Sequence, residues 1–119
     1  MKRNTPLKPR NPKRKAENFE RAYGGEARVL WIQAHPCVAC GAKPCHNAHT
    51  KGGGAGRKAD ARWIVPLCAT CHDAYHRIGQ RTFEMGMGID LDHEAQVIDA
   101  RYEQHLATEA RKHVGERKP

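Results

Sequence analysis

Four of the five cysteines fall in two pairs that have the spacing of metal ligands. Cys37-Val-Ala-Cys40 and Cys68-Ala-Thr-Cys71 are each a C-x2-C motif, and residues 41–67 separate them. Each pair can form a tight turn that presents two thiolates to one ion, and two such turns complete the tetrahedral four-cysteine site of structural zinc. A redox motif would need only one pair. The spacing therefore predicts a structural zinc bound by all four cysteines.

Two histidines follow the second cysteine pair at helical spacing. If a helix begins at about Cys71, residues i and i+4 lie on one face, so His72 and His76 can both reach one ion. A bare H-x3-H pair is equally compatible with two solvated histidines on a surface helix, and this alternative stays open. Their position directly after a zinc pair favours the interpretation as metal ligands.

Upstream of this helix, two short segments can pair as a two-stranded ribbon. They cover residues 44–49 and 63–67, and both are of mixed apolar character. A zinc shared by the two cysteine pairs would hold the base of the ribbon beside the helix. We therefore expect His49 to lie near His72 and His76.

The connection between the two segments is rich in glycine and in cations. Its glycine run fits neither the G-x4-G-K-[ST] motif nor the G-x-G-x-x-G motif, so it is not a nucleotide site. A loop without side chains lets a phosphate backbone approach closely, and flanking cations supply the attraction. A connector with solvated charges is the alternative. The cations are Lys51, Arg57, Lys58 and Arg62.

The composition indicates one small domain with a polyanionic partner. A chain of 119 residues has room for one domain. Only 39% of the residues are hydrophobic and 6% aromatic, which suggests that metal binding supplements a modest core. The formal net charge of +8 favours nucleic acid as the partner. No apolar run approaches the roughly 20 residues of a transmembrane helix, and the N-terminus lacks the apolar part of a signal peptide, so we expect an intracellular protein without membrane contact.

The N-terminal segment, residues 1–16, is basic and rich in proline, and we expect it to be a disordered arm. Its lysines and arginines, including Lys13, Arg14 and Lys15, would bind DNA phosphates and gain affinity by counterion release. A solubilising tail is the alternative interpretation.

Helices are expected on both sides of the cysteine-rich centre. Apolar residues recur at helical spacing over residues 17–34, with an interruption at Gly24-Gly25. Residues 80–85 form a second, short helix. A longer one begins at Asp92 as its N-cap and reaches about Val114 before Gly115.

Taken together, the stretches "HNAHT" and "ADARWIVPLCATCHDAYH" resemble the signature of the HNH endonuclease superfamily. The shared pattern is a first-strand histidine, a loop, a second strand that ends in a P-L-C-x2-C-H turn, and a helix with a further histidine. Within the superfamily, the sequence is most similar to small zinc-binding phage and prophage members, including the recombination-enhancement nucleases that act with RecA. The resemblance covers roughly residues 37–91.

The resemblance implies a role for each matching histidine. His49 takes the place of the general base, His72 that of the metal-binding histidine after the cysteine pair, and His76 that of a further ligand. A neutral imidazole suits deprotonation of water at cellular pH. A divalent cation, Mg2+ or Mn2+ or another ion, would neutralise charge that develops on the phosphate.

The sequence departs from the superfamily pattern at two positions. Ala48 stands where many members have a metal ligand, and Trp63 stands near the place of the central asparagine. His46 or Asp60 could supply the missing ligand.

The sequence thus predicts an α+β protein, a small zinc-stapled ββα-metal (HNH) module flanked by helices. Residues 17–119 would form a single domain, with the zinc and ββα core at about 37–78 and C-terminal helices at about 80–114. We expect a metal-dependent DNA endonuclease for phage or prophage recombination or DNA processing in the bacterial cytoplasm. The resemblance implies a RecA filament as a further partner. A catalytically inactive zinc-ribbon DNA-binding or adaptor protein is the alternative.

Overall fold

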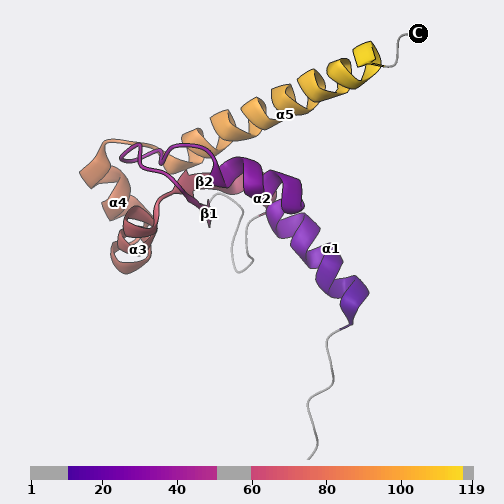
Figure 1. Ribbon diagram of the computed structural model, residues 1–119. Coiled ribbons are helices and arrows are strands. Elements are labelled where there is room, and N and C mark those ends of the chain that lie inside the picture. Colours follow the sequence, from indigo (N-terminus) through magenta and orange to yellow (C-terminus); the bar gives the residue numbers. More distant parts are fainter. Residues whose placement is uncertain (1–10, 51–59, 117–119) are drawn as a thin grey trace, which may run out of the picture.

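Two short strands lie at the centre of the fold, with helices on both of their faces (Figure 1). The structure is a computed structural model that describes residues 11–50 and 60–116, with side chains up to residue 112. The class is α+β, as predicted. The elements are α1 (Pro12–Tyr23), α2 (Glu26–Gln33), β1 (His46–His49), the 3-10 turn η2 (Ala61–Trp63), β2 (Ile64–Leu67), α3 (Ala69–Ile78), α4 (Gln80–Met87) and α5 (Leu91–Glu116).

The strands form the predicted two-stranded ribbon. β1 and β2 are antiparallel, with His46 opposite Leu67 and His49 opposite Ile64. Every residue of β2 is buried. Because side chains alternate between the faces of a strand, His46 and Ala48 lie on one face of the ribbon, whereas His49 lies on the other.

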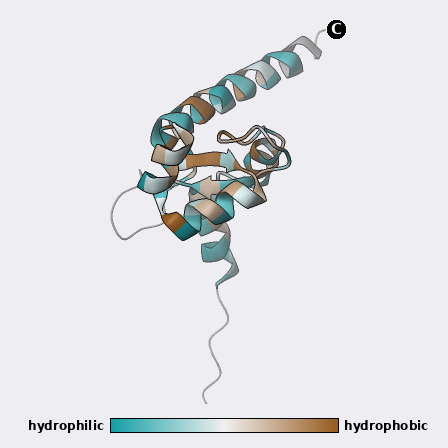
Figure 2. Cartoon of the chain, turned by 90° about the vertical axis from the view of Figure 1, so that its left-hand side faces the viewer, coloured by the Kyte–Doolittle hydropathy of each residue, from teal (hydrophilic) through white to brown (hydrophobic). Residues whose placement is uncertain are grey.

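The two faces of the ribbon belong to two apolar clusters. On the α3 side, Ala48, Val65 and Leu67 pack with Tyr75 of α3, and this cluster continues into α4 and the first turns of α5. On the α2 side, Ile64 packs with residues of α2 and α5. Figure 2 shows the hydrophobic strand at the centre and hydrophilic residues along the projecting ends of α1 and α5.

The N-terminal helix begins earlier than the sequence analysis predicts. Residues 12–16, which we expected to belong to the disordered arm, form the first turn of α1. Asn11 is the N-cap, and its side-chain oxygen accepts a hydrogen bond from the backbone N–H of Lys13 at 3.0 Å. Pro12 stands at the first helical position, where its fixed φ is favourable. The local capping geometry therefore outweighs the high charge. Residues 1–10 of the expected arm lie outside the described residues.

The predicted helix break at Gly24-Gly25 is confirmed. Gly24 has a φ of 77° and ends α1, while Gly25 precedes α2. A Cβ at Gly24 would lie 2.6 Å from Cδ of Arg28, so both the backbone conformation and the close approach require glycine. α1 and α2 can thus fold as separate helices that contact the ribbon from different directions.

The C-terminal helices match the prediction except at their ends. Asp90, not Asp92, caps α5: its side chain accepts a hydrogen bond from the backbone N–H of His93 at 3.2 Å, and its carbonyl accepts one from Glu94 at 2.9 Å. The last helix continues to Glu116 and does not end before Gly115. Its C-terminal half projects beyond the rest of the described fold (Figure 1). None of the helices in the described ranges combines the length and the apolar character needed to cross a membrane.

Candidate functional site

The four predicted cysteines converge at the base of the ribbon. Their sulfur atoms all lie within 4.8 Å of one another. Cys37 and Cys40 lie on the turn after α2, which the hydrogen bond from Val38 N–H to the carbonyl of Pro66 ties to β2. Cys68 follows β2 and is the N-cap of α3, and Cys71 lies in the first turn of that helix.

The donor set fits a tetrahedral metal. Zn–S bonds of about 2.3 Å in a tetrahedron place the sulfur atoms about 3.8 Å apart, and the Sγ atoms of Cys40 and Cys68 are 3.6 Å apart. In the part of the chain that the structure describes, this is the only set of three or more cysteine, histidine or carboxylate ligands that converges on one point. The cysteines therefore form a candidate zinc site.

The electrostatics of the four-cysteine group also favour a cation. Burial alone would raise the pKa of the Cys37 thiol, but hydrogen bonds from the backbone N–H groups of Cys68, Ala39 and Cys40 lower it to about 7. The pKa of Cys71 is raised, first by burial and then by the neighbouring sulfurs. Four thiolates so close together repel one another, and a bound cation removes this repulsion.

The fifth cysteine, Cys45, is buried beside this group but outside it. Its Sγ donates to the carbonyl of Ala42 at 3.2 Å. Burial, together with the neighbouring Cys37, raises its pKa to about 11. It is therefore a protonated, structural thiol at neutral pH.

Three histidines form a cluster on the α3 side of the ribbon. Nδ1 of His46 lies 3.0 Å from Nδ1 of His72, and Nε2 of His72 lies 2.9 Å from Nε2 of His76. The predicted i, i+4 placement of His72 and His76 on one helix is thus observed. Burial lowers the pKa of His72, and the charges of His76 and His46 lower it further. A neutral His72 ring donates one of its two hydrogen bonds and accepts the other.

His49 lies away from this cluster, which corrects the prediction that it lies near His72 and His76. The alternation of the strand turns His46 toward α3 and His49 toward α1. Nε2 of His49 is 2.6 Å from the carbonyl oxygen of Ala22, and the Tyr23 ring meets the imidazole edge-on at a centroid distance of 5.0 Å.

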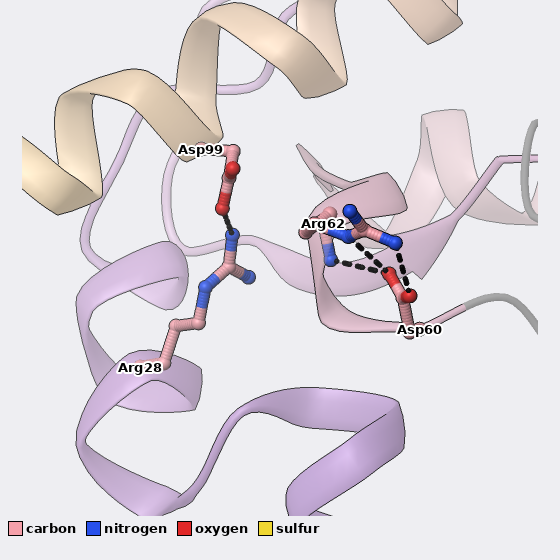
Figure 3. A network of polar contacts seen from close by, with 4 residues as sticks. All are labelled: Arg28, Asp60, Arg62 and Asp99. Carbon is pink, nitrogen blue, oxygen red and sulfur yellow. Dashed lines mark hydrogen bonds and ion pairs between the residues drawn. The ribbon is translucent and has the colours of Figure 1, made fainter.

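Asp60, the other suggested metal ligand, is held by an arginine (Figure 3). Its carboxylate accepts hydrogen bonds from the backbone N–H, the Nε and an Nη of Arg62 at 3.0, 3.3 and 3.0 Å. These bonds from Arg62 lower the pKa of Asp60. Asp60 caps η2 and belongs to no convergent ligand group among the residues described.

The basic residues named in the sequence analysis fall into two sets. Lys13, Arg14 and Lys15 are exposed on the first turn of α1, and Arg62 is exposed on η2. The glycine run and the cations beside it, Lys51, Arg57 and Lys58, lie outside the described residues.

Sequence reasoning missed the surroundings of His49. The carbonyl of Ala22 and the ring of Tyr23 approach it from α1. On the other side, the hydroxyl of Tyr75 donates to the His49 carbonyl at 2.9 Å. These contacts join residues more than twenty positions apart, and no local pattern in the sequence indicates them.

Comparison with known families gives one match. The family described as "Protein of unknown function (DUF968)" matches residues 10–104, from the N-cap region of α1 to the middle of α5. The chain therefore belongs to this family. Comparison with curated proteins and comparison with solved structures each gave no match.

Proposed function

We propose that this member of the DUF968 family is a metal-dependent DNA endonuclease of the HNH type. The observation that supports the proposal best is the order and junction of three elements. An antiparallel ribbon runs directly into a helix, four cysteines gather at that junction, and histidines lie on both the first strand and the helix. This is the arrangement that the sequence resemblance implies.

In this proposal, His49 is the general base that deprotonates the attacking water. Its Nε2 lies 2.6 Å from a carbonyl oxygen, which can only accept a hydrogen bond. A neutral His49 therefore carries its proton on Nε2, and Nδ1 is the basic nitrogen. The carbonyl of Ala22 also orients the ring, as hydrogen-bond acceptors beside catalytic histidines do.

His72 and His76 are the residues that would hold the catalytic ion. Their Nε2 atoms are close enough together for both to bind one ion. His46 meets the other ring nitrogen of His72, Nδ1, so the three histidines do not converge on one point, and His46 would position His72. A divalent ion bound there supplies neutralisation of the charge that develops on the phosphate and on the leaving oxygen. The four-cysteine zinc has a separate, architectural role, since it holds β2 and α3 together.

A second candidate function is a catalytically inactive zinc protein that binds DNA. One observation favours it: His49 and the histidine cluster occupy opposite faces of the ribbon, whereas a base and a metal must reach the same phosphate. In this alternative, the contact between His49 and Ala22 is a structural tie between β1 and α1.

A nuclease assay on two variants of His49 separates the candidates. His49→Gln keeps an N–H donor for the Ala22 carbonyl but has no basic nitrogen, whereas His49→Ala loses both. Wild type with Mg2+ or Mn2+ should nick or cut DNA, and both variants should lose this activity. His49→Gln should retain the zinc content and the thermal stability. His93→Gln, at an exposed histidine of α5, is the matched control and should cut normally.

One outcome of this assay would favour the inactive protein. It is undetectable activity in wild type and in both variants, with any divalent ion, on duplex, single-stranded and branched DNA. Equal, measurable activity in all three would instead refute His49 as the general base. Because the resemblance implies a RecA filament as partner and recombination in a phage-infected bacterial cell as context, the assay includes DNA coated with RecA.

A further inference from the structure

Helix α1 presents several of its cations, but neither of its carboxylates, to one cavity. The cavity opens on one side, and its lining includes three cations and an aromatic ring, contributed by Arg14, Lys15, Arg21 and Phe19. The two carboxylates of the helix are absent from that lining. Glu17 and Glu20 stand at i+4 and i+7 from Lys13, so these three residues form one row along the helix, next to the residues that line the cavity. Of all the α1 side chains that the structure describes, only cations and neutral groups thus line the cavity.

The cavity-lining side of α1 ends at His49. The Ala22 carbonyl in the last turn meets the His49 imidazole, and the Tyr23 ring packs against it. Phe19, one turn earlier, stacks on Tyr23 with a centroid distance of 5.5 Å and an interplanar angle of 29°. A row of three rings therefore leads from the exposed surface of α1 to the proposed general base.

We propose that this side of α1 binds a DNA strand and guides it to His49. Arg14, Lys15 and Arg21 contact successive phosphates, and Phe19 packs against sugar or base edges. From Arg14 to Arg21 the helix rises about 10 Å, the axial length of about three base pairs. The inference rests on the proposed nuclease function, because the strand it positions is the substrate of His49.

The chemistry of this surface favours nucleic acid over a lipid membrane. An interfacial helix needs a broad apolar face to enter the headgroup region. Among the described α1 residues, Phe19 is the only exposed large hydrophobic side chain, with an exposed fraction of 42%. Cations beside a single exposed ring are instead typical of surfaces that follow a phosphate backbone.

Two adjacent residues of the first turn provide the test, because Arg14 lines the cavity and Lys13 does not. Arg14→Gln and Lys13→Gln each remove one positive charge from an exposed position in the first turn. Both are made in the His49→Gln background, and binding to a fluorescein-labelled DNA duplex and to its single strand is measured by anisotropy over a range of salt concentrations. Circular dichroism checks that α1 remains folded.

The proposal predicts different salt dependences for the two variants. Each phosphate contact contributes about −0.9 to the slope of log K against log salt on duplex DNA. Arg14→Gln should therefore make the slope shallower by about 0.9 on the duplex. Lys13, which the sequence also suggested as a phosphate contact, does not line the cavity, so Lys13→Gln should leave the slope unchanged. Equal slopes in the two variants would overturn the proposal. Binding to phosphatidylserine vesicles with no binding to either DNA would overturn it as well.

The binding measurement does not depend on whether the protein cuts DNA. If the wild type cuts DNA but the two variants bind alike, the surface proposal fails and the nuclease proposal stands. If Arg14→Gln alone weakens binding but wild type never cuts DNA, α1 is a DNA-binding helix of an inactive protein.

Discussion

The buried ion pair between α2 and α5 offers the sharpest test of how the fold is held together. Nη2 of Arg28 donates to Oδ1 of Asp99 at 3.2 Å, and the two side chains are 4% and 30% exposed (Figure 3). The guanidinium also lies 5.2 Å from the centroid of the Tyr102 ring. Its other terminal nitrogen, Nη1, is buried and has no hydrogen-bond partner among the described residues. The guanidinium charge of Arg28 is therefore almost completely buried, and one of its terminal nitrogens makes no hydrogen bond with the described residues.

This asymmetry predicts that the two residues are not equivalent. Asp99→Ala leaves a buried guanidinium without a counterion. Removing one partner of a buried pair costs roughly 3–5 kcal/mol, and because Asp99 is 30% exposed and partly screened, we expect about 2–3 kcal/mol. Arg28→Met removes the charge and the unpaired Nη1, whose burial alone costs about 1–3 kcal/mol, and it keeps most of the apolar stem. Asp99 can then be hydrated, so we expect Arg28→Met to cost less than about 1 kcal/mol.

Urea denaturation of the zinc-loaded protein, followed by circular dichroism, measures these differences in unfolding free energy. The Arg28→Met/Asp99→Ala double variant should be close in stability to Arg28→Met alone, because without the guanidinium the loss of Asp99 leaves no buried charge unpaired. Asp73→Ala is the control: it breaks the ion pair between Asp73 and Arg77 on the surface of α3, whose side chains are both 69% exposed, and it should cost less than about 0.5 kcal/mol. If Arg28→Met proves more destabilising than Asp99→Ala, the assignment of the burial cost to the guanidinium is refuted.

Two further predictions concern the cysteines. Removal of the metal by a chelator should cause a cooperative loss of ordered structure, and an unchanged melting curve with chelator would contradict the metal assignment. Cobalt substitution should give the absorption spectrum of an ion bound by four sulfurs, and this spectrum should be retained in Cys45→Ala but lost in Cys71→Ala. Because burial raises the pKa of Cys45 to about 11, its thiolate fraction at neutral pH is small and grows as the pH rises toward that value. Iodoacetamide followed by mass spectrometry should therefore modify Cys45 slowly in the native protein and rapidly after unfolding.

The features that the sequence predicted correctly are those set by local patterns. The two C-x2-C pairs indicate their own convergence, because each turn presents both of its sulfurs in one direction. The i, i+4 spacing of His72 and His76 becomes a contact as soon as a helix forms. The break at Gly24-Gly25 follows from the ability of glycine to adopt a positive φ.

The features that the sequence did not predict depend on which faces pack together. The pattern of a strand assigns alternate residues to its two faces. Apolar residues far away in the sequence determine which helix covers each face. Ile64 turns toward Ile32 and Ile98, so its ladder partner His49 turns toward α1. The start of α1 was missed for another reason. The high positive charge of residues 1–16 indicated a disordered segment, although Asn11-Pro12 is a local signal for the start of a helix.

The two faces of the ribbon are stabilised by different means, and this has a consequence for the proposed site. The α3 face is held by the four cysteines together with its apolar cluster, so its histidine cluster should depend in part on a metal bound by the cysteines. The α2 face is held by Ile32, Ile64 and Ile98 and by the contact between His49 and the Ala22 carbonyl. Loss of the metal should therefore disturb the environments of His72 and His76 more than that of His49. Loss of either metal, the structural or the catalytic one, should therefore inactivate the proposed nuclease, whereas the proposed DNA binding through α1 should depend on neither directly.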